Sequence, residues 1–379
     1  MGIEDCDYVG VTAMTPMYPI ALEVCKSIKR INRKTVIVLG GYHATFFDRQ
    51  ILRGCRGIDI VVRGEGEKPF LDVLNGVSRS IIPGITYRDE YNKIRRNPDG
   101  PPLQSEEIPI PAYHLLSGHL RQYRLNISTV RGCRYKCSFC VNNVFWGKER
   151  FRNLKDVMSE LTYLADKAEE GTLLHFCDNN LAGSRHRLIQ LCNLLIEAKL
   201  PFSFSCDLRV DHVDEEAVRM LRRAGFVRIM MGVEDADDLV LDSSSKGLSF
   251  KTNLRAARLI KENSDIIVSA YWLWGLPGSS RTTVRANIQK IAELFTADNL
   301  IDEVRGGSFV PLPGTVMYSN PEKFGMEIIS SDWSKYLRDL FPVYRLRTLN
   351  EYELYLANLA LQAAVTVGYM WKWLCRKVA

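Results

Sequence analysis

The sequence predicts an α/β protein with three parts. These are an incomplete, Rossmann-like (flavodoxin-like) domain at residues 1–100, a partial (β/α)6 barrel at 126–316 and a helical C-terminal extension at 317–379. Apolar strand-like runs alternate with amphipathic helix-like runs in the first two parts, which favours parallel sheets with right-handed crossovers. A Pro-rich stretch interrupts the alternation and marks a linker at 101–125.

The first part contains few strands. Strands are expected at 7–15, 35–41 and 58–67, and helices at 18–32, 49–55 and 69–77. Residues 84–100 read as a strand pair that turns around Asn92. Three parallel strands are few for an independent open sheet, so we expect this domain to be incomplete.

The second part repeats the strand–helix unit more often. Strands are expected at 125–133, 172–180, 202–210, 227–235, 266–278 and 303–315, and helices at 154–168, 185–198, 215–225, 251–263 and 282–295. Six strands are about three quarters of an eightfold barrel, so an open barrel is the simplest closure. Its ligands should lie at the carboxyl ends of the strands.

The tail ends in an apolar stretch at 354–375, which is long enough to cross a bilayer. Asn358, Gln362 and Lys372 interrupt it, so we expect a packed helix. Contact of its basic, Trp-containing end with a membrane surface is the alternative.

Composition and charge fit an ordinary enzyme, with 46% hydrophobic and 25% charged residues. The net charge of +6 comes from 50 basic and 44 acidic residues spread along the chain, which argues against a nucleic-acid tail. No signal peptide is recognisable at the start, so we expect a reducing cytoplasm and a small-molecule substrate, acidic or phosphate-bearing molecules included.

Three of the ten cysteines lie close together in RGCRYKCSFC, residues 131–140. Cys133, Cys137 and Cys140 occupy a polar loop after a glycine, where their thiols can converge. Three thiolates can hold three corners of an iron–sulfur cubane and leave the fourth iron open. Zinc remains an alternative, although the nearest histidines, His114 and His119, precede the loop. The other cysteines lie mostly in apolar runs and are expected to be buried thiols: Cys6, Cys25, Cys55, Cys177, Cys192, Cys206 and Cys375.

The CxxxCxxC spacing directly after the first barrel strand, with Phe139 before the last cysteine, resembles the signature of the radical S-adenosylmethionine (SAM) superfamily. Motifs that resemble this family follow in order at the later strand ends: FCDNN, SCDLRVDHVDEE, MGVEDADD, SSSKGLSF, WGLPGSS and PLPGT. One departure is Asn179, which stands where many relatives carry a second Asp.

The resemblance implies that Cys133, Cys137 and Cys140 hold a [4Fe–4S] cluster whose open iron binds SAM. It also implies a set of SAM-binding residues: Phe139, Asp178, Asp207, Arg209, Glu234, Lys246, Gly275 and Pro277. In this set Glu234 would bind ribose hydroxyls or the ammonium group, and Lys246 the carboxylate, while the glycine loop would let backbone approach the adenine. A surface ion pair and an ordinary tight turn are the structural alternatives.

Three aromatic residues, Tyr271, Trp272 and Trp274, precede the fifth-strand loop. They are expected to pack the barrel wall rather than to line a substrate pocket. No catalytic residue is predicted.

The first part resembles the second half of the cobalamin-binding domain that precedes the barrel in one branch of this family. VTAMT, GGYHAT and VVRGEGE carry this resemblance, which implies contacts to the nucleotide tail of cobalamin from Thr15, Gly40, Gly41, His43 and Thr45. The family's domain opens with two further strands, so we expect a truncated domain with an exposed sheet edge and an incomplete pocket. His43 is not predicted to be a cobalt ligand. The tail resembles the extension of anaerobic magnesium-protoporphyrin cyclases and hopanoid methylases.

The resemblance implies a radical SAM enzyme that performs cobalamin-dependent methylation or oxidative rearrangement, with an electron donor such as flavodoxin or ferredoxin. The first alternative is a cobalamin-independent enzyme that abstracts hydrogen. The second is a non-catalytic iron–sulfur or zinc protein, which the adenosyl-binding motifs disfavour.

Overall fold

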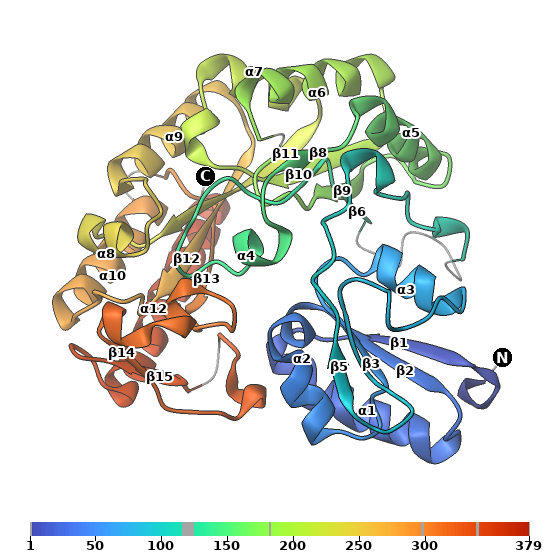
Figure 1. Ribbon diagram of the computed structural model, residues 1–379. Coiled ribbons are helices and arrows are strands. Elements are labelled where there is room, and N and C mark those ends of the chain that lie inside the picture. The colour runs from blue at the N-terminus through green and yellow to red at the C-terminus, as the bar shows by residue number, and fades with distance from the viewer. Residues whose placement is uncertain (1, 116–124, 182, 297–298, 339–340, 379) are drawn as a thin grey trace.

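The computed structural model describes residues 2–115, 125–181, 183–296, 299–338 and 341–378. Residues 116–124 of the expected linker, His119 among them, lie outside the described residues. Figure 1 shows an N-terminal unit at lower right, a curved sheet with helices along its outer side, and a C-terminal part at lower left. The predicted α/β class with an open, partial barrel is confirmed.

The N-terminal sheet has the order β1-β2-β3-β4-β5. Its parallel strands are β1 (Tyr8–Thr12), β2 (Val36–Gly40) and β3 (Ile60–Val62), and its helices are α1 (Tyr18–Ile31), α2 (Tyr42–Gly54) and α3 (Glu67–Leu74). The strand pair expected around Asn92 forms β4 (Ile85–Arg88) and β5 (Ile94–Arg96) and extends the sheet antiparallel to β3. In the described part of the chain β1 is an edge strand, as predicted.

The larger sheet consists of parallel strands in the order β13-β12-β11-β10-β9-β6. These are β6 (Leu125–Ile127), β9 (Thr172–Phe176), β10 (Phe202–Asp207), β11 (Phe226–Glu234), β12 (Ile267–Trp274) and β13 (Glu303–Ser308). Apolar residues of neighbouring strands fill the core, and the rings of Phe176, Phe204 and Phe226 lie 5.5–5.6 Å apart. Because β6 and β13 do not pair, the barrel stays open.

The barrel helices begin at polar residues whose side chains accept a backbone N–H of the first turn. They are α5 (Leu154–Ala165), α6 (Arg185–Ala198), α7 (Glu215–Arg223), α9 (Phe250–Asn263) and α10 (Arg281–Phe295), capped by Asn153, Ser184, Asp214, Ser249 and Ser280. In Figure 1 they follow the outside of the arc, so the strand ends are free to carry a site on its inside.

Shorter elements surround the strand ends. They are β7 (Val130–Arg131) paired with β8 (Arg150–Phe151), α4 (Asn142–Trp146), α8 (Asp238–Ser243) and α11 (Val316–Ser319). Single 3-10 turns occur at Ile3–Asp5, Thr15–Met17, Ser105–Glu107, Tyr113–Leu115, Val210–His212, Pro321–Phe324 and Trp333–Lys335.

The C-terminal extension combines a two-stranded sheet with one long helix. β14 (Met326–Ile328) pairs with β15 (Tyr344–Leu346), a hairpin that the helical reading of the sequence did not predict. The apolar stretch at 354–375 lies within α12 (Glu351–Val378), which packs against α10 and β13. None of the helices among the described residues combines the length and apolarity needed to cross a membrane.

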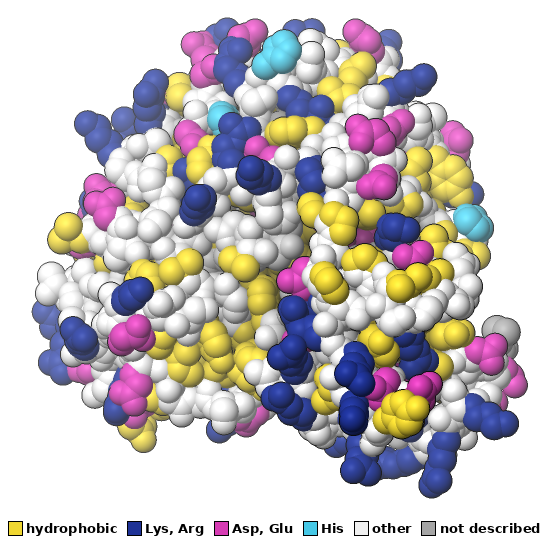
Figure 2. All heavy atoms as spheres, in the orientation of Figure 1, with side chains coloured by type: hydrophobic (Ala, Val, Ile, Leu, Met, Phe, Trp, Pro, Cys, Tyr) yellow, Lys and Arg dark blue, Asp and Glu magenta, His cyan; other side chains and the backbone are white. Residues whose placement is uncertain are grey.

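Charged side chains of both signs are mixed over the face of the molecule in Figure 2. Lys and Arg are densest over the N-terminal unit at lower right, and hydrophobic side chains are more frequent over the neighbouring C-terminal part.

Candidate functional site

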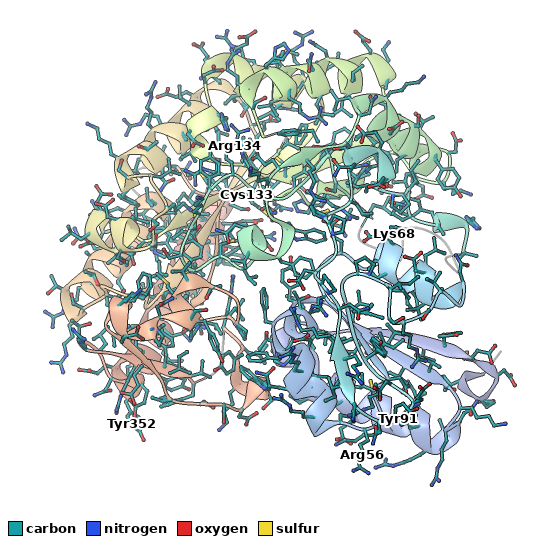
Figure 3. All side chains as sticks on the ribbon, viewed as in Figure 1. Arg56, Lys68, Tyr91, Cys133, Arg134 and Tyr352 are labelled. Atoms are coloured by element: carbon teal, nitrogen blue, oxygen red, sulfur yellow. The ribbon has the colours of Figure 1, made fainter. Side chains whose placement is uncertain are left out.

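The cysteine loop owes its shape to Gly132, which has a φ of +87°. A Cβ at this position would lie 2.3 Å from the carbonyl oxygen of Lys148, so only glycine fits without displacing the backbone. The Cys133 N–H donates to the carbonyl of Gly147, and the β7–β8 pair closes the base of the loop. Figure 3 shows Cys133 inside the arc of the barrel, near α4.

The middle of the loop is held by Ser138, which is 5% exposed. Its N–H donates to the carbonyl of Ser244 over 2.8 Å, and its carbonyl accepts the N–H of Met317 over 3.2 Å. Its hydroxyl contacts that of Ser245 over 3.1 Å. Backbone hydrogen bonds from the barrel and from the extension thus hold the cysteine loop in place.

Cys133, Cys137 and Cys140 all line one cavity of about 210 Å³, here named the inner cavity. The remaining residues of its wall are Tyr135, Phe139, Asn142, Asn143, Asn179, Asp207, Leu208, Arg209, Met230, Gly232, Glu234, Lys246, Leu248 and Tyr271. Among the described residues, no three His, Cys, Asp or Glu side chains lie close enough together to hold one metal ion. A cubane differs from a single ion in that each thiolate binds a separate iron.

Burial governs the ionisation of the three thiols. It raises the pKa of Cys133, Cys137 and Cys140, the last to about 11. Lys246 and Arg209 oppose this shift at Cys137 by favouring the thiolate. Burial therefore favours protonated thiols at neutral pH, and metal binding has to displace these protons.

Glu234 and Lys246 form a buried ion pair at the wall of the inner cavity. Lys246 Nζ lies 2.5 Å from Glu234 Oε1, and the side chains are only 6% and 10% exposed. Glu234 ends β11 with a φ of +65°, where the register with β12 shifts. The surface ion pair that was the alternative at this position is therefore wrong, because both charges are withdrawn from solvent.

Asp207 and Arg209 face the same cavity from the end of β10. Asp207 Oδ1 is buried and makes no hydrogen bond with any described residue. Arg209 lies 3.5 Å above the ring of Tyr135, donates to the carbonyl of Lys246 over 3.2 Å and pairs with Asp211. An unpartnered buried carboxylate oxygen calls for a donor from a bound molecule.

Asp178 is 1% exposed and is not in the cavity wall. Its carboxylate accepts the N–H and hydroxyl of Thr129, both over 2.6 Å, the N–H of Val130 and the hydroxyl of Ser128. It fixes the strand that leads into the cysteine loop, so the structure gives Asp178 a positioning role, and its contact to SAM stays a prediction.

Gly275 and Pro277 also lie away from the inner cavity. A Cβ at Gly275 would lie 2.6 Å from the Tyr344 hydroxyl, which donates to the Gly275 carbonyl over 2.7 Å. The Pro277 carbonyl accepts the hydroxyl of Ser243. This loop is shaped by its packing against the extension and α8, and its approach to adenine stays a prediction.

A second cavity of about 410 Å³, here named the outer cavity, adjoins the inner one. The two share Phe139, Cys140, Asn142, Asp207, Glu234 and Tyr271. The outer cavity adds Val141, Leu273, Phe309, Val310, Leu312 and Arg338. The site is therefore one two-part chamber, polar near the cysteines and more apolar toward the extension.

The expectation that the fifth-strand aromatics pack the wall holds for two of the three. Trp272 and Trp274 are 0% and 4% exposed and belong to the core. The side chain of Tyr271 lies on the opposite face of the strand and lines both cavities. Burial and the nearby Asp207 raise the pKa of Tyr271 to about 12, so its phenol stays protonated.

A third cavity of about 620 Å³, here named the interdomain cavity, lies at the carboxyl ends of β1, β2 and β3. Gly40 and Gly41 line it together with Thr12, Glu65 and Phe70, and α4 contributes Phe145 and Trp146. Ligands of open α/β sheets bind at this edge.

Thr15, His43 and Thr45 do not line the interdomain cavity. His43 is 1% exposed, stacks on Tyr18 and contacts Trp333, and burial lowers its pKa to about 4. Thr15 lies beside His43, and Thr45 joins the carbonyl of Gly41 to the N–H of Gly64. These three side chains support the glycine loop without lining the interdomain cavity.

The helix α4 separates the interdomain cavity from the two-part chamber and lines both. Asn142 faces the chamber, whereas Phe145 and Trp146 face the interdomain cavity. The hydroxyl of Tyr42 connects the residues that line the two cavities. It donates to Asn142 Oδ1 over 2.8 Å and accepts the indole N–H of Trp146 over 2.7 Å.

Ion pairs join the N-terminal sheet to the base of the cysteine loop. Glu65, whose side chain is 6% exposed, pairs with Arg131 over 2.7 Å and with Arg150 over 2.6 Å. Arg131 also pairs with Glu67 over 2.6 Å. The base of the cysteine loop is thereby fixed to the N-terminal sheet.

Sequence reasoning missed several residues of these walls, among them Tyr42, Asn142, Trp146 and Arg338. Asn142 and Trp146 follow Cys140 so closely that their proximity to the motif was a usable signal. Arg338 gave no signal, because only the folding of the extension brings it to the barrel.

Comparison with protein families supports the division seen in the structure. Residues 3–74 match the B12 binding domain, and residues 127–291 match the radical SAM superfamily. The first match covers the parallel strands of the N-terminal sheet, and the second begins at the end of β6 and reaches into α10.

Two relatives align with most of this chain. The anaerobic magnesium-protoporphyrin IX monomethyl ester cyclase of Rubrivivax gelatinosus is 29% identical over 345 residues, which cover 87% of this chain and 60% of that protein. An uncharacterized methyltransferase of Pyrococcus horikoshii is 29% identical over 356 residues, which cover 90% and 75%. The chain thus spans about three fifths of the cyclase and three quarters of the methyltransferase.

Among solved structures, the radical SAM methyltransferase TsrM of Kitasatospora setae, with cobalamin and a [4Fe–4S] cluster bound, superposes with a TM-score of 0.70. The sequence identity is 21%, and the match covers 88% of this chain and 71% of TsrM. At this identity the match establishes the shared fold.

Proposed function

We propose that this chain, which belongs to the radical SAM superfamily and carries a B12-binding domain ahead of its radical SAM domain, is a cobalamin-dependent methylase or a related rearranging enzyme. The two families imply a [4Fe–4S] cluster, SAM and cobalamin as cofactors. We keep the division into residues 1–100, a linker at 101–125, a barrel at 126–316 and an extension at 317–379 as part of this proposal.

The inner cavity fits a cluster and SAM through the chemistry of its donors. Cys133, Cys137 and Cys140 supply thiolates for three irons, and the described residues that line the cavity include no fourth cysteine. Glu234 and Lys246 offer a carboxylate and an ammonium for the polar ends of SAM. Asp207 Oδ1, which is buried without a partner, supplies a further acceptor.

The interdomain cavity fits the tail of cobalamin through its backbone edge. Gly40 and Gly41 expose main chain at the carboxyl end of β2, and Phe70, Phe145 and Trp146 supply apolar surface. Thr15, His43 and Thr45 support this edge indirectly by fixing the glycine loop.

The observation that carries the proposal is the double role of α4. The helix follows Cys140 directly, and its two faces line the cysteine chamber and the interdomain cavity. Molecules in the two cavities would lie on either side of this single helix, which is about 10 Å across and so allows an electron to pass between them. Transfer of a group would require the two molecules to meet directly.

When bound, the reduced cluster supplies the electron that cleaves SAM, and cobalamin supplies a methyl carrier. A flavodoxin or ferredoxin would deliver the electron. Glu234 and Lys246 orient SAM. Arg209 lies on the ring of Tyr135 in the wall of the inner cavity. The apolar wall of the outer cavity excludes water from a small-molecule substrate.

The test is anaerobic. The protein is loaded with iron and sulfide, reduced, and given SAM with and without cobalamin, and the nucleoside products are separated. The proposal expects 5′-deoxyadenosine, together with S-adenosylhomocysteine that forms only when cobalamin is present. 5′-Deoxyadenosine alone, with turnover indifferent to cobalamin, would favour a hydrogen-abstracting enzyme that does not use the cofactor.

A further inference from the structure

We infer that the outer cavity binds a substrate with an apolar body and one carboxylate, which pairs with Arg338. The inference rests on the proposed function, because it takes the inner cavity as the place of SAM and leaves the outer cavity for the substrate.

Arg338 is held in place without an ionic partner. Its backbone carbonyl accepts the N–H of Ser308 over 3.1 Å. A Cβ on Gly307 would lie 2.8 Å from Arg338 Cβ and 3.2 Å from its Cδ, so the stem of the arginine lies directly against this glycine. The guanidinium forms no ion pair with any described residue, although it belongs to the cavity wall.

The other cations near the chamber are already paired, whereas the carboxylate of Asp207 has, among the described residues, only His175 as an ionic partner, 3.5 Å away. Lys246 binds Glu234, and Arg209 binds Asp211. Arg305, which precedes the glycine pair of β13, binds Glu303. Arg338 is therefore the unpaired cation in the described wall of the outer cavity. The residue is exposed, so its guanidinium is accessible to the anionic group of a ligand entering the cavity.

The remaining wall defines the rest of the ligand. Phe139, Val141, Leu273, Phe309, Val310 and Leu312 present apolar surface between Arg338 and the cysteines. Asp207 Oδ1, at the junction of the two cavities, lacks a donor. A substrate with its carboxylate at Arg338 and a hydroxyl or N–H at its other end would match the exposed cation and the buried, unpartnered acceptor.

The single guanidinium favours a carboxylate over a phosphate. A phosphate monoester carries nearly two negative charges at neutral pH and three acceptor oxygens. The described wall offers one unpaired cation, which matches the single charge and two oxygens of a carboxylate.

The test uses matched probes on the cluster-loaded protein, kept anaerobic and followed by equilibrium dialysis. The probes are 2-naphthoate, which carries a carboxylate, 2-naphthylmethanol, which is its neutral counterpart, and 2-naphthyl phosphate. We expect Arg338→Gln to weaken 2-naphthoate binding about tenfold and to leave 2-naphthylmethanol unchanged. Arg345→Gln, which removes an extension arginine paired with Glu327 and outside the cavity wall, should change neither affinity.

Equal weakening of both naphthalene probes by Arg338→Gln, no weakening of either, or no binding of 2-naphthoate to the wild-type protein would overturn the inference. Binding of 2-naphthyl phosphate about tenfold tighter than 2-naphthoate would overturn the choice of a carboxylate. SAM cleavage by the wild-type protein is measured in the same preparation. Cleavage without carboxylate discrimination defeats this inference alone, whereas absence of cleavage defeats the proposed function.

Discussion

The hydroxyl of Tyr42, two residues after Gly40, donates to Asn142 Oδ1, two residues after Cys140, over 2.8 Å. Asn142 in turn donates to Asn179 Oδ1 over 2.6 Å, and Asn179 reaches the carbonyl of Gly132. A continuous chain of hydrogen bonds therefore links the glycine loop of the B12-binding domain to both ends of the cysteine loop.

Replacing Tyr42 by Phe should uncouple these two sites. The ring still stacks on Phe145, but Asn142 Oδ1 and the Trp146 indole lose a partner, at about 1–3 kcal/mol for each group that water cannot reach. We expect cobalamin-dependent S-adenosylhomocysteine to fall several-fold more than 5′-deoxyadenosine, as product analysis will measure. Tyr91→Phe, which removes a hydroxyl from the exposed ring labelled in Figure 3, is the control. An equal fall in both products would show that Tyr42 only stabilises the protein.

Replacing Gly132 by Ala should prevent the cysteine loop from closing. The left-handed backbone and the collision with the Lys148 carbonyl together cost about 1–3 kcal/mol or displace the loop. We expect iron bound after reconstitution to fall to less than about half of the wild-type value. Gly54→Ala, in α2 with open space around it, should load normally. Full iron loading of the Gly132 variant would contradict the geometry described for this loop.

Variants of the ion pair of Glu234 and Lys246 can separate its contribution to SAM binding from its contribution to the free energy of unfolding. Lys246→Met leaves Glu234 buried without a partner and should cost about 3–5 kcal/mol of unfolding free energy. The double variant Glu234→Gln with Lys246→Met removes both charges and should recover much of this loss, as denaturant unfolding will report. SAM affinity, measured by equilibrium dialysis, should remain reduced at least tenfold in both variants. Wild-type affinity in the double variant would mean that the pair is purely structural.

Asp235 makes the stability depend on pH. Burial raises its pKa to about 7, whereas the unfolded group ionises near 4, so the folded state holds a proton that the unfolded state has lost between these values. Stability is therefore lost as the pH rises through 7, by about 1.4 kcal/mol between pH 6 and 8 for this group.

Asp235→Asn keeps the acceptor oxygen for Asn287 and the Asp237 N–H but cannot ionise. Relative to the wild type, the variant should gain stability on going from pH 6 to pH 8, as the urea midpoint of the metal-free, reduced protein will show. A constant difference between the two proteins across this range would exclude Asp235 as the titrating group.

The sequence was sufficient for the order of strands and for the cysteine loop, because apolar periodicity and the CxxxCxxC spacing are local signals. It also identified Glu234 and Lys246, whose contact the barrel brings about. It did not predict the protein contacts of Asp178 and Gly275, because a carboxylate or a glycine at a strand end looks the same whether it faces a ligand or the neighbouring chain. Arg338 and Tyr42 depend on long-range packing between the parts, which no local pattern records.

The most direct test of the account is cleavage of SAM by Cys137→Ala, compared with Cys177→Ala, under anaerobic reduction after loading with iron and sulfide. Cys137 lines the inner cavity, and Cys177 is a free, exposed cysteine outside it. The account predicts that 5′-deoxyadenosine is lost in the first variant and kept in the second. Undiminished 5′-deoxyadenosine from Cys137→Ala would contradict it.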